Sequence, residues 1–131
     1  MEPETAAGGG LRFLLTTEFV YWHLRGRQEA VRLMKALASA GKPCISAVSV
    51  LELQMLAADQ PPEGVALIEA LPVVALTGKT AARAAELLRN DSLGLDSTQA
   101  QLVATCLEEG LVLVHTWPER VGLPGLLEVS L

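Results

Sequence analysis

The sequence predicts an α/β fold with a central, mainly parallel β-sheet. Short apolar runs alternate with segments of helical periodicity along the chain, which is the pattern of strands connected by crossover helices. Two of the runs, Leu11–Leu15 and Leu111–His115, are almost continuously apolar, as strands are when helices cover both faces of a sheet. Together these observations predict a three-layer α/β/α domain.

The first half of the chain is predicted to alternate strand and helix. Helical spacing places Ala30, Met34 and Leu37 on one face, Gly41 ends that helix, and Pro43 prevents its restart. A later helix ends before Pro61. The predicted elements are a strand at Leu11–Leu15, a helix at Arg27–Ala40, a strand at Cys44–Ser46 and a helix at Val48–Ala58.

The second half is predicted to follow the same alternation. Asp96, Ser97 and Thr98 are capping candidates for its last helix, which Gly110 ends. The predicted helices are Gly64–Leu71, Thr80–Arg89 and Ser97–Glu109, and the predicted strands are Val73–Leu76, Leu111–His115 and an edge strand at Leu127–Val129.

Length and composition indicate one globular domain. The chain has 131 residues, of which 50% are hydrophobic, which excludes an intrinsically disordered protein. Residues 1–10 are polar and end in three glycines, so we expect a flexible N-terminal extension before a domain at 11–131. No apolar run approaches the roughly 18–20 residues of a membrane span, so we expect no membrane association.

Net charge, cysteine content and histidine spacing bear on the kind of partner, the cellular location and metal binding. The formal net charge is −5 and aromatic residues make up 4% of the chain, which argues against a general nucleic-acid-binding protein. Cys44 and Cys106 lie in apolar surroundings, as buried thiols do, and they favour a cytoplasmic location. His23 and His115 have no partner at metal-ligand spacing; we expect His115 to be a core or rim histidine.

Polar residues follow the predicted strands at the edge where parallel α/β sheets bind ligands. Thr16, Thr17 and Glu18 follow the first strand, and Glu52 lies on the helix after the second. His115, Thr116 and Trp117 follow the fourth strand. These three places are the predicted site.

Four blocks of the sequence resemble PIN domains of the VapC toxin type, in the same order and at similar spacing. The blocks are RFLLTTEFVYWHLRGR, ISAVSVLELQML, STQAQLVATCLEEGLVLVHT and PERVGLPGLLEV, which together run from about Arg12 to Val129. The resemblance implies a PIN-like α/β/α fold. It also implies a metal-dependent ribonuclease, in which clustered carboxylates bind Mg²⁺ or Mn²⁺ and activate water.

Most of the acids that this resemblance requires are missing. The Asp position at the end of the first strand is Thr16, the Thr after it is kept as Thr17, and the usual Asn is Glu18. The helix acid is kept as Glu52. The Asp that opens the late helix corresponds to Gln99, and the acid or amide after the fourth strand corresponds to Trp117.

The loss of these carboxylates predicts a degenerate site, because a hard divalent cation needs charged oxygen ligands. The resemblance then implies no cofactor, and Mg²⁺ or Mn²⁺ only if the protein is active. The alternative is a three-carboxylate metal site formed by Glu52 with Glu18 and Asp96 as substitutes. Against it, Asp96 is a good helix N-cap, Glu18 can be solvated near the start of a helix, and Glu52 can bond to Thr16, Thr17 or Gln99. A one-turn register shift would instead place Asp96 at the Gln99 position.

Three other groups have competing interpretations. One group is a basic cluster of Arg25, Arg27, Arg32 and Lys35. It is interpreted either as a contact for RNA or an acidic partner, or as a solvated helix face. The aromatic residues Tyr21, Trp22 and Trp117 either fill the vacated cleft or form a recognition surface. Cys106 is expected to be a packed thiol.

Two functions follow from the resemblance. In the first, the protein is a degenerate VapC-like PIN domain, weak or inactive as a nuclease, that acts by binding protein or RNA. An antitoxin-like protein and a second copy in a homodimer are the expected partners. In the second, it is an active Mg²⁺- or Mn²⁺-dependent endoribonuclease, the toxin of a toxin–antitoxin pair, with a shifted set of carboxylates.

Overall fold

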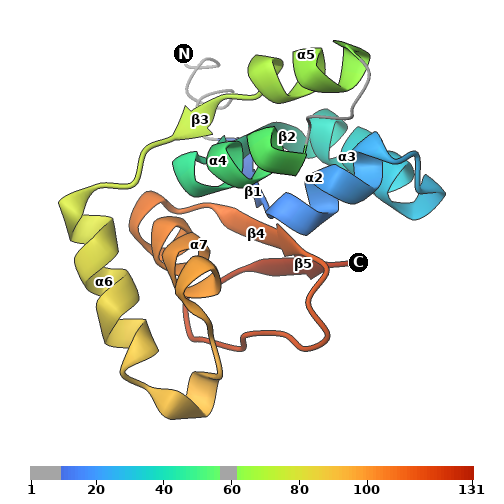
Figure 1. Cartoon of the computed structure of the whole chain (residues 1–131). Coiled ribbons are helices and arrows are strands. Elements are labelled where there is room, and N and C mark those ends of the chain that lie inside the picture. Colours follow the sequence, from blue (N-terminus) through green and yellow to red (C-terminus); the bar gives the residue numbers. More distant parts are fainter. Residues whose placement is uncertain (1–9, 57–61) are drawn as a thin grey trace, which may run out of the picture.

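The computed structural model describes residues 10–56 and 62–131, so the expected extension lies outside the described residues except at Gly10. Helices and strands alternate along the chain (Figure 1). The strands are β1 (Leu11–Leu15), β2 (Gly41–Ser46), β3 (Val73–Val74), β4 (Val112–His115) and β5 (Glu128–Ser130). The helices are α2 (Thr17–Leu24), α3 (Gln28–Ala40), α4 (Ala47–Leu56), α5 (Pro62–Ala70), α6 (Gly78–Leu88) and α7 (Ser97–Glu109), with a 3₁₀ turn, η2, at Asp91–Leu93.

The five strands form one parallel sheet in the order β3-β2-β1-β4-β5. Helices α2 to α5 lie on one side of this sheet, and α6 and α7 lie on the other (Figure 1). The three-layer α/β/α prediction is therefore confirmed, and β5 is an edge strand as expected.

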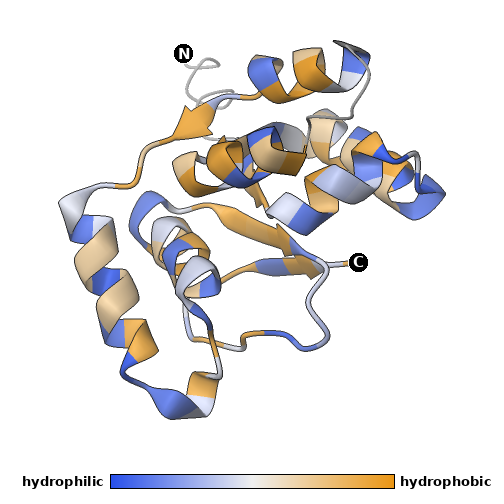
Figure 2. Ribbon diagram, viewed as in Figure 1, coloured by the Kyte–Doolittle hydropathy of each residue, from blue (hydrophilic) through white to orange (hydrophobic). Residues whose placement is uncertain are grey.

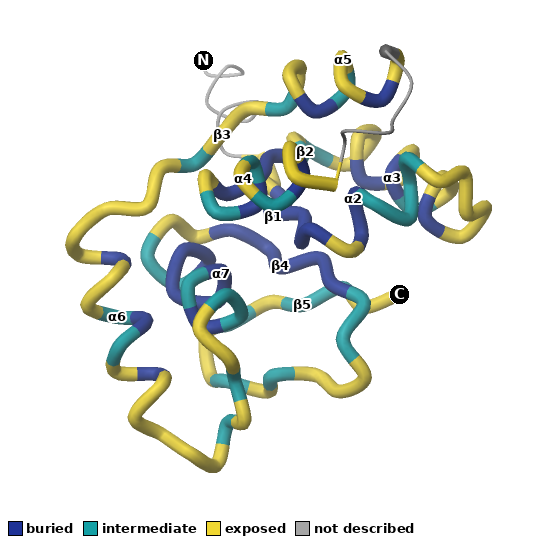
Figure 3. Tube along the Cα trace, in the orientation of Figure 1, coloured by how far each residue is buried: buried dark blue, intermediate teal, exposed yellow. Residues whose placement is uncertain are grey.

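Each face of the sheet has its own hydrophobic core, because successive side chains of a strand point to opposite faces. Phe13 and Leu15 of β1 pack with α2 to α5, whereas Leu14 between them packs with α6 and α7. β4 divides in the same way and is almost uniformly hydrophobic (Figure 2). Burial follows this pattern: β4 and the inner face of α7 are buried, whereas the outer face of α6 is exposed (Figure 3).

Gly41 changes the chain from helix to strand where the sequence predicted that the helix ends. A Cβ atom at this position would collide with the backbone carbonyl of Leu11 on the neighbouring strand. Pro43 lies in β2 before the part that pairs with β3, so this side of β2 is still an edge and no ladder donor is lost there. Because Pro43 is tolerated on this edge, β2 begins at Gly41, three residues before the predicted start at Cys44.

Other element boundaries differ by a few residues. The helix predicted at Val48–Ala58 is described from Ala47 to Leu56, and residues 57–61 lie outside the described residues. The strand predicted at Val73–Leu76 pairs over only two residues. Helix α2 and turn η2 were not assigned from the sequence; α2 has no clear amphipathic stripe, since its segment TEFVYWHL is apolar on most sides.

The order of the strands reverses beside β1. From β1 the chain passes to β2 and β3 on one side, then crosses to β4 and β5 on the other. The crevice beyond the carboxyl ends of β1 and β4 is therefore the topological switch point, where open α/β sheets bind ligands. In the described residues, no helix is long and apolar enough to cross a membrane.

Candidate functional site

Thr16 stands at the carboxyl end of β1, in the switch-point crevice. Its backbone N–H donates to the carbonyl of Val114 on β4 at 3.0 Å, which ties the ends of the two strands together. The Thr16 side chain is fully buried, and its hydroxyl has no hydrogen-bond partner among the described residues. An apolar-packed hydroxyl thus stands at the position where the resemblance calls for an acid.

Thr17, Ser49 and Glu52 form a second feature, here called the β1-side cluster. The Thr17 hydroxyl donates a short hydrogen bond to Glu52 Oε1, and it lies 3.0 Å from Ser49 Oγ. Thr17 begins α2, and the other two residues lie one turn apart on α4, so packing of these helices creates the cluster. Glu52 is half-buried and uses one carboxylate oxygen within the protein.

A cavity of about 170 Å³ brings the three candidate carboxylates together. Glu18, Glu52 and Asp96 all line it. Its remaining walls come from Thr98, Gln99, Leu102 and Trp117. Five of the seven site positions selected from the sequence therefore line one cavity, whereas Thr16 and Thr17 do not.

Asp96 caps helix α7. Its Oδ1 accepts from the backbone N–H of Gln99 at 2.8 Å, and Gln99 Oε1 accepts from the backbone N–H of Asp96 at 3.0 Å. This reciprocal pair is a capping box, which satisfies two otherwise free donors of the first helical turn. The N-cap interpretation is thereby confirmed for Asp96, and the side-chain carbonyl of Gln99 is also engaged.

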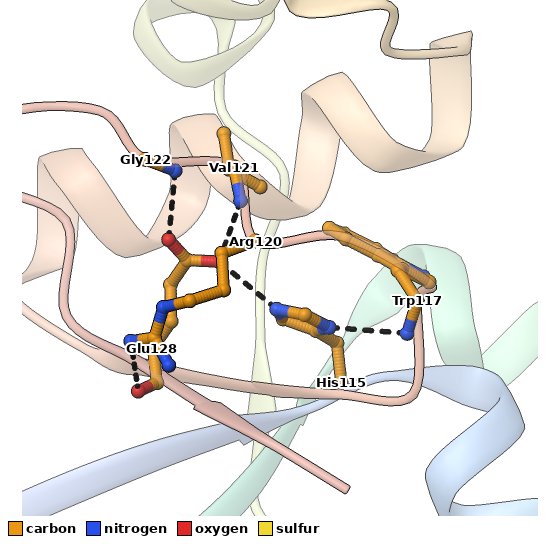
Figure 4. A network of polar contacts seen from close by, with 6 residues as sticks. All are labelled: His115, Trp117, Arg120, Val121, Gly122 and Glu128. Atoms are coloured by element: carbon orange, nitrogen blue, oxygen red, sulfur yellow. Dashed lines mark hydrogen bonds and ion pairs between the residues drawn. The ribbon is translucent and has the colours of Figure 1, made fainter.

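The β4 side of the crevice is closed by a network of His115, Trp117 and Glu128, here called the β4-side network (Figure 4). His115 is fully buried, and its Nε2 lies 2.9 Å from Glu128 Oε1. The backbone N–H of Trp117 donates to His115 Nδ1 at 3.1 Å. The indole of Trp117 stacks on the imidazole, with 4.7 Å between ring centroids and 18° between planes.

These contacts fix the tautomer of His115. Because Nδ1 accepts from Trp117, the proton of the neutral ring is on Nε2, which donates it to Glu128. Both ring nitrogens are occupied within the protein, so His115 is the core histidine that the sequence predicted rather than a free base for chemistry.

Glu128 is held by four polar contacts. Its carboxylate accepts from the backbone N–H groups of Val121 at 2.8 Å and Gly122 at 2.9 Å, and its carbonyl accepts from Arg120 at 3.0 Å. Burial raises the pKa of Glu128, but the hydrogen bonds from Gly122, Val121 and His115 outweigh it and leave the pKa below its ordinary value. The carboxylate is therefore ionised and committed to the loop that precedes it.

The residues of the crevice do not fit a divalent cation as they stand. A magnesium site would need carboxylate oxygens free to converge on one point. Glu52 is bonded to Thr17 and Asp96 to Gln99, and Thr16 and Trp117 offer no charge. Across residues 10–56 and 62–131, no group of three or more His, Cys, Asp or Glu side chains is placed to hold a metal ion.

Two larger hollows flank this cavity. One, of about 400 Å³, extends from η2 to the loop after β4, and it shares Gln99 and Trp117 with the carboxylate cavity. The other, of about 320 Å³, lies between the start of α2 and the end of α4 and includes Met55 and Leu56. Leu51 and Met55 on the outward face of α4 are 62% and 74% exposed, so this helix presents apolar side chains to solvent.

The remaining candidates lie elsewhere. All four residues of the basic cluster are exposed, near the turn between α2 and α3. Arg27 lies 3.7 Å over the Trp22 ring and Arg25 lies 5.8 Å over Tyr21, and these two aromatic residues do not line the carboxylate cavity. Cys106 is a buried, packed thiol as expected, and burial raises its pKa.

Sequence reasoning missed two functional neighbours. Ser49 had no signal besides being three residues before Glu52, one helical turn away. Glu128 stood in the expected last strand as a charged residue next to apolar ones, which could have marked it as a partner for a buried histidine.

Comparison with known proteins identifies a family and several solved structures that this chain resembles. The PIN domain family matches residues 13–117. A VapBC2 complex from Rickettsia felis, bound to a DNA fragment from its promoter, superposes with a TM-score of 0.74 at 14% identity over 92% of this chain and 99% of that one. A toxin–antitoxin complex from Klebsiella pneumoniae gives a TM-score of 0.74 at 20% identity over 87% and 94%.

A DNA-bound VapBC from Salmonella typhimurium gives a TM-score of 0.70 at 22% identity, over 92% of this chain and 98% of that one. At these identities the similarity establishes the fold. No curated protein matches the sequence significantly. Glu128 and most of the loop that it holds lie beyond the part matched by the family.

Proposed function

Because the chain belongs to the PIN-domain family, we propose that it is a degenerate VapC-like protein, weak or inactive as a nuclease, that acts by binding a partner. The family's ribonuclease chemistry depends on a cation that polarises a phosphate and activates water. A chain that cannot hold this cation keeps the fold and its binding surfaces but loses the reaction.

One observation carries this proposal: two of the three carboxylates that remain in the crevice already have one oxygen bonded within the protein. Glu52 accepts from Thr17, and Asp96 accepts from Gln99 within the capping box. Each of these carboxylates therefore has only its second oxygen left for a cation, and displacing the bond already made would cost about 1.5–3 kcal/mol. The third acid, Glu18, is exposed and would have to be ordered to take part.

A protein partner is favoured over RNA. The solved structures with the same fold include toxin–antitoxin complexes, which supports an antitoxin-like partner. The net charge of −5 and the acids around the cavity repel phosphates. RNA contact would be confined to the exposed basic cluster, whose residues do not line this acidic cavity.

A second copy of the chain is the other proposed partner, through the outward face of α4. Leu51 and Met55 are among the most exposed large apolar side chains of the described residues, and the adjoining 320 Å³ hollow is largely apolar. Apolar patches of this kind typically mark protein interfaces. Light scattering of the parent and of Met55→Glu tests this point: a dimer that Met55→Glu dissociates, and Val31→Glu on α3 does not, is the expected result.

Metal binding and RNA cleavage test the proposed loss of activity. We expect calorimetric titration with Mn²⁺ to give only millimolar or weaker binding, unchanged by Glu52→Ala, and we expect no cleavage of RNA above background. Metal-dependent cleavage that disappears in Glu52→Ala would overturn the proposal.

The second candidate function is an active Mg²⁺- or Mn²⁺-dependent endoribonuclease. The observation in its favour is that Glu18, Glu52 and Asp96 line a single cavity. This candidate requires the carboxylate oxygens of Glu52 and Asp96 that are not already bonded to converge on one cation together with Glu18. Asp96→Asn separates the two functions, because Asn keeps the cap but lacks the charge: a nuclease would lose activity, whereas a degenerate protein would be unchanged in every binding assay.

A further inference from the structure

Trp117 lines two neighbouring hollows, and it is held by contacts with residues that line neither of them. Trp117 and Gln99 line both the 170 Å³ carboxylate cavity and the 400 Å³ hollow beside it. Neither His115 nor Glu128 lines these cavities, yet both belong to the network that holds Trp117 (Figure 4).

We infer that Glu128 is a positioning residue: acting through His115, it holds the Trp117 indole as the wall of the carboxylate cavity. The C-terminal strand β5 thereby fixes the shape of the binding site. This inference rests on the proposed function only in naming the cavity as a binding site, because the geometry of the wall does not depend on the ligand.

The first step is the orientation of the imidazole. Glu128 Oε1 accepts a hydrogen bond from the Nε2–H of His115, so Nδ1 is unprotonated and faces the backbone N–H of Trp117. Without the carboxylate, the proton has no acceptor on that side of a fully buried ring, and the ring is free to flip or change tautomer. A tautomer change would turn an N–H toward the Trp117 N–H and a flip would turn a carbon toward it, so either change would break that hydrogen bond.

The second step is the loop on which Trp117 lies. The two oxygens of Glu128 accept from Val121 and Gly122, so one carboxylate fixes the loop and the histidine together. Gly122 has a φ of +75°, in the left-handed region that favours glycine, and this turns its N–H toward the carboxylate. Trp117 is consequently held at its backbone by His115 and farther along its loop by Glu128.

The third step is the stacked ring pair. The imidazole covers one face of the indole at a centroid distance of 4.7 Å, and a stacked aromatic pair of this kind is stabilising beyond the area that it buries. A correctly oriented imidazole therefore fixes the indole itself as well as the backbone from which it extends.

Amide hydrogen exchange of the full chain, followed by NMR, tests the inference with Glu128→Gln. Gln keeps the size of the side chain, but it lacks the charge and replaces one acceptor oxygen with an N–H₂ donor. We expect the amides of Trp117, Val121 and Gly122 to exchange about tenfold faster or more, while those of Leu113 and Val114 in β4 keep their rates. Glu119→Gln is the matched control: Glu119 is an exposed acid of the same loop, and we expect no change.

Fluorescence provides a readout of the indole itself. The chain has two tryptophans, so in a Trp22→Phe background Trp117 is the only one. We expect Glu128→Gln to increase the acrylamide quenching of Trp117, and Glu119→Gln to leave it unchanged.

Two outcomes would overturn the inference. If Val121 and Gly122 exchange faster while the Trp117 amide and its quenching stay at parent values, Glu128 holds the loop alone. If all β4 amides accelerate equally, Glu128 acts on global stability and not on position. Neither outcome depends on metal or RNA, so failure here is distinguishable from failure of the proposed function.

Discussion

The polar groups at the two sides of the crevice differ in how completely the protein hydrogen-bonds a carboxylate. The β1-side cluster keeps a half-buried carboxylate, Glu52, with one oxygen bonded and the side chain facing a cavity. The β4-side network places its carboxylate, Glu128, away from the cavities and satisfies it fully with backbone and histidine donors. The comparison teaches that an acid near a strand end serves binding or structure according to how many of its acceptor sites the protein fills.

Restoring the missing acids of the family pattern, which also removes the indole of Trp117, should produce the largest change in metal affinity. The substitutions Thr16→Asp, Gln99→Asp and Trp117→Asp together rebuild the acidic pattern of the family beside Glu52. Because ligand charge tunes the affinity for hard cations over several orders of magnitude, we expect Mn²⁺ affinity to rise about 100-fold or more in calorimetric titration.

Without metal, the carboxylate that Thr16→Asp introduces would be a buried, unpaired charge, so the triple variant should also gain thermal stability from Mn²⁺ in differential scanning fluorimetry. The parent chain is the control and should show no such gain. A triple variant that folds yet binds Mn²⁺ no better than the parent would mean that the acids were not what the crevice lacked.

Removing the acid on each side should next show the difference in stability. Glu128→Ala leaves His115 and two backbone donors without a partner, and we expect the free energy of unfolding to fall by about 3 kcal/mol in urea denaturation. Glu52→Ala removes a half-buried acid with one bonded oxygen and leaves the Thr17 hydroxyl with Ser49 as its partner, so we expect a smaller loss of about 1 kcal/mol. Equal effects of the two substitutions would remove the distinction between the two sides.

The capping box of α7 gives a smaller and more selective effect. Asp96→Ala removes the acceptor for the Gln99 N–H, so we expect a loss of about 1 kcal/mol, measured by urea denaturation. Asp96→Asn should retain nearly all of the stability. A substantial loss in Asp96→Asn would show that the charge, and not the cap, is what α7 requires.

The pH dependence of stability should be the smallest effect and should have two windows. The pKa of Glu128 lies below its ordinary value of 4.5, so the folded state binds this proton less well than the unfolded state. The stability that it contributes is present above pH 4.5 and is lost as pH falls through the folded pKa. Burial lowers the pKa of His23 from 6.5, so stability also begins to fall below pH 6.5.

Thermal unfolding between pH 8 and pH 3 measures both windows. His23→Gln should remove the decline that begins near pH 6.5, and Glu128→Gln should reduce the decline below pH 4.5. Greater stability at acidic pH in the parent would contradict both assignments.

Sequence reasoning succeeded where the signal is local. Gly41 ended α3 where expected, because a helix stop and the collision of any Cβ with Leu11 depend on one residue. Asp96 was a capping candidate because its partner is three residues away. The α/β fold followed from strand and helix order, which the five-stranded parallel sheet confirms, and its PIN-like form was implied by the resemblance of four sequence blocks.

Contacts between distant segments were beyond local reasoning. The bond between Thr17 and Glu52, 35 residues apart, was one of three partners expected for Glu52 from the resemblance. The contact of Thr17 with Ser49 depends on the packing of α2 against α4, and that of His115 with Glu128 depends on the register of β4 and β5, so neither had a local signal. The sequence therefore selected five of the seven residues that line the cavity, but it did not show which carboxylate oxygens were already bonded. That distinction decides between a metal site and a structural one.

Manganese-soaked crystals of the parent chain test the central claim most directly. We predict no anomalous peak with protein ligands beside Glu52, because Glu52 and Asp96 each have one oxygen bonded within the protein and the neighbouring positions Thr16, Gln99 and Trp117 carry no charge. A well-occupied Mn²⁺ peak chelated by Glu52 together with Glu18 or Asp96 would contradict the account.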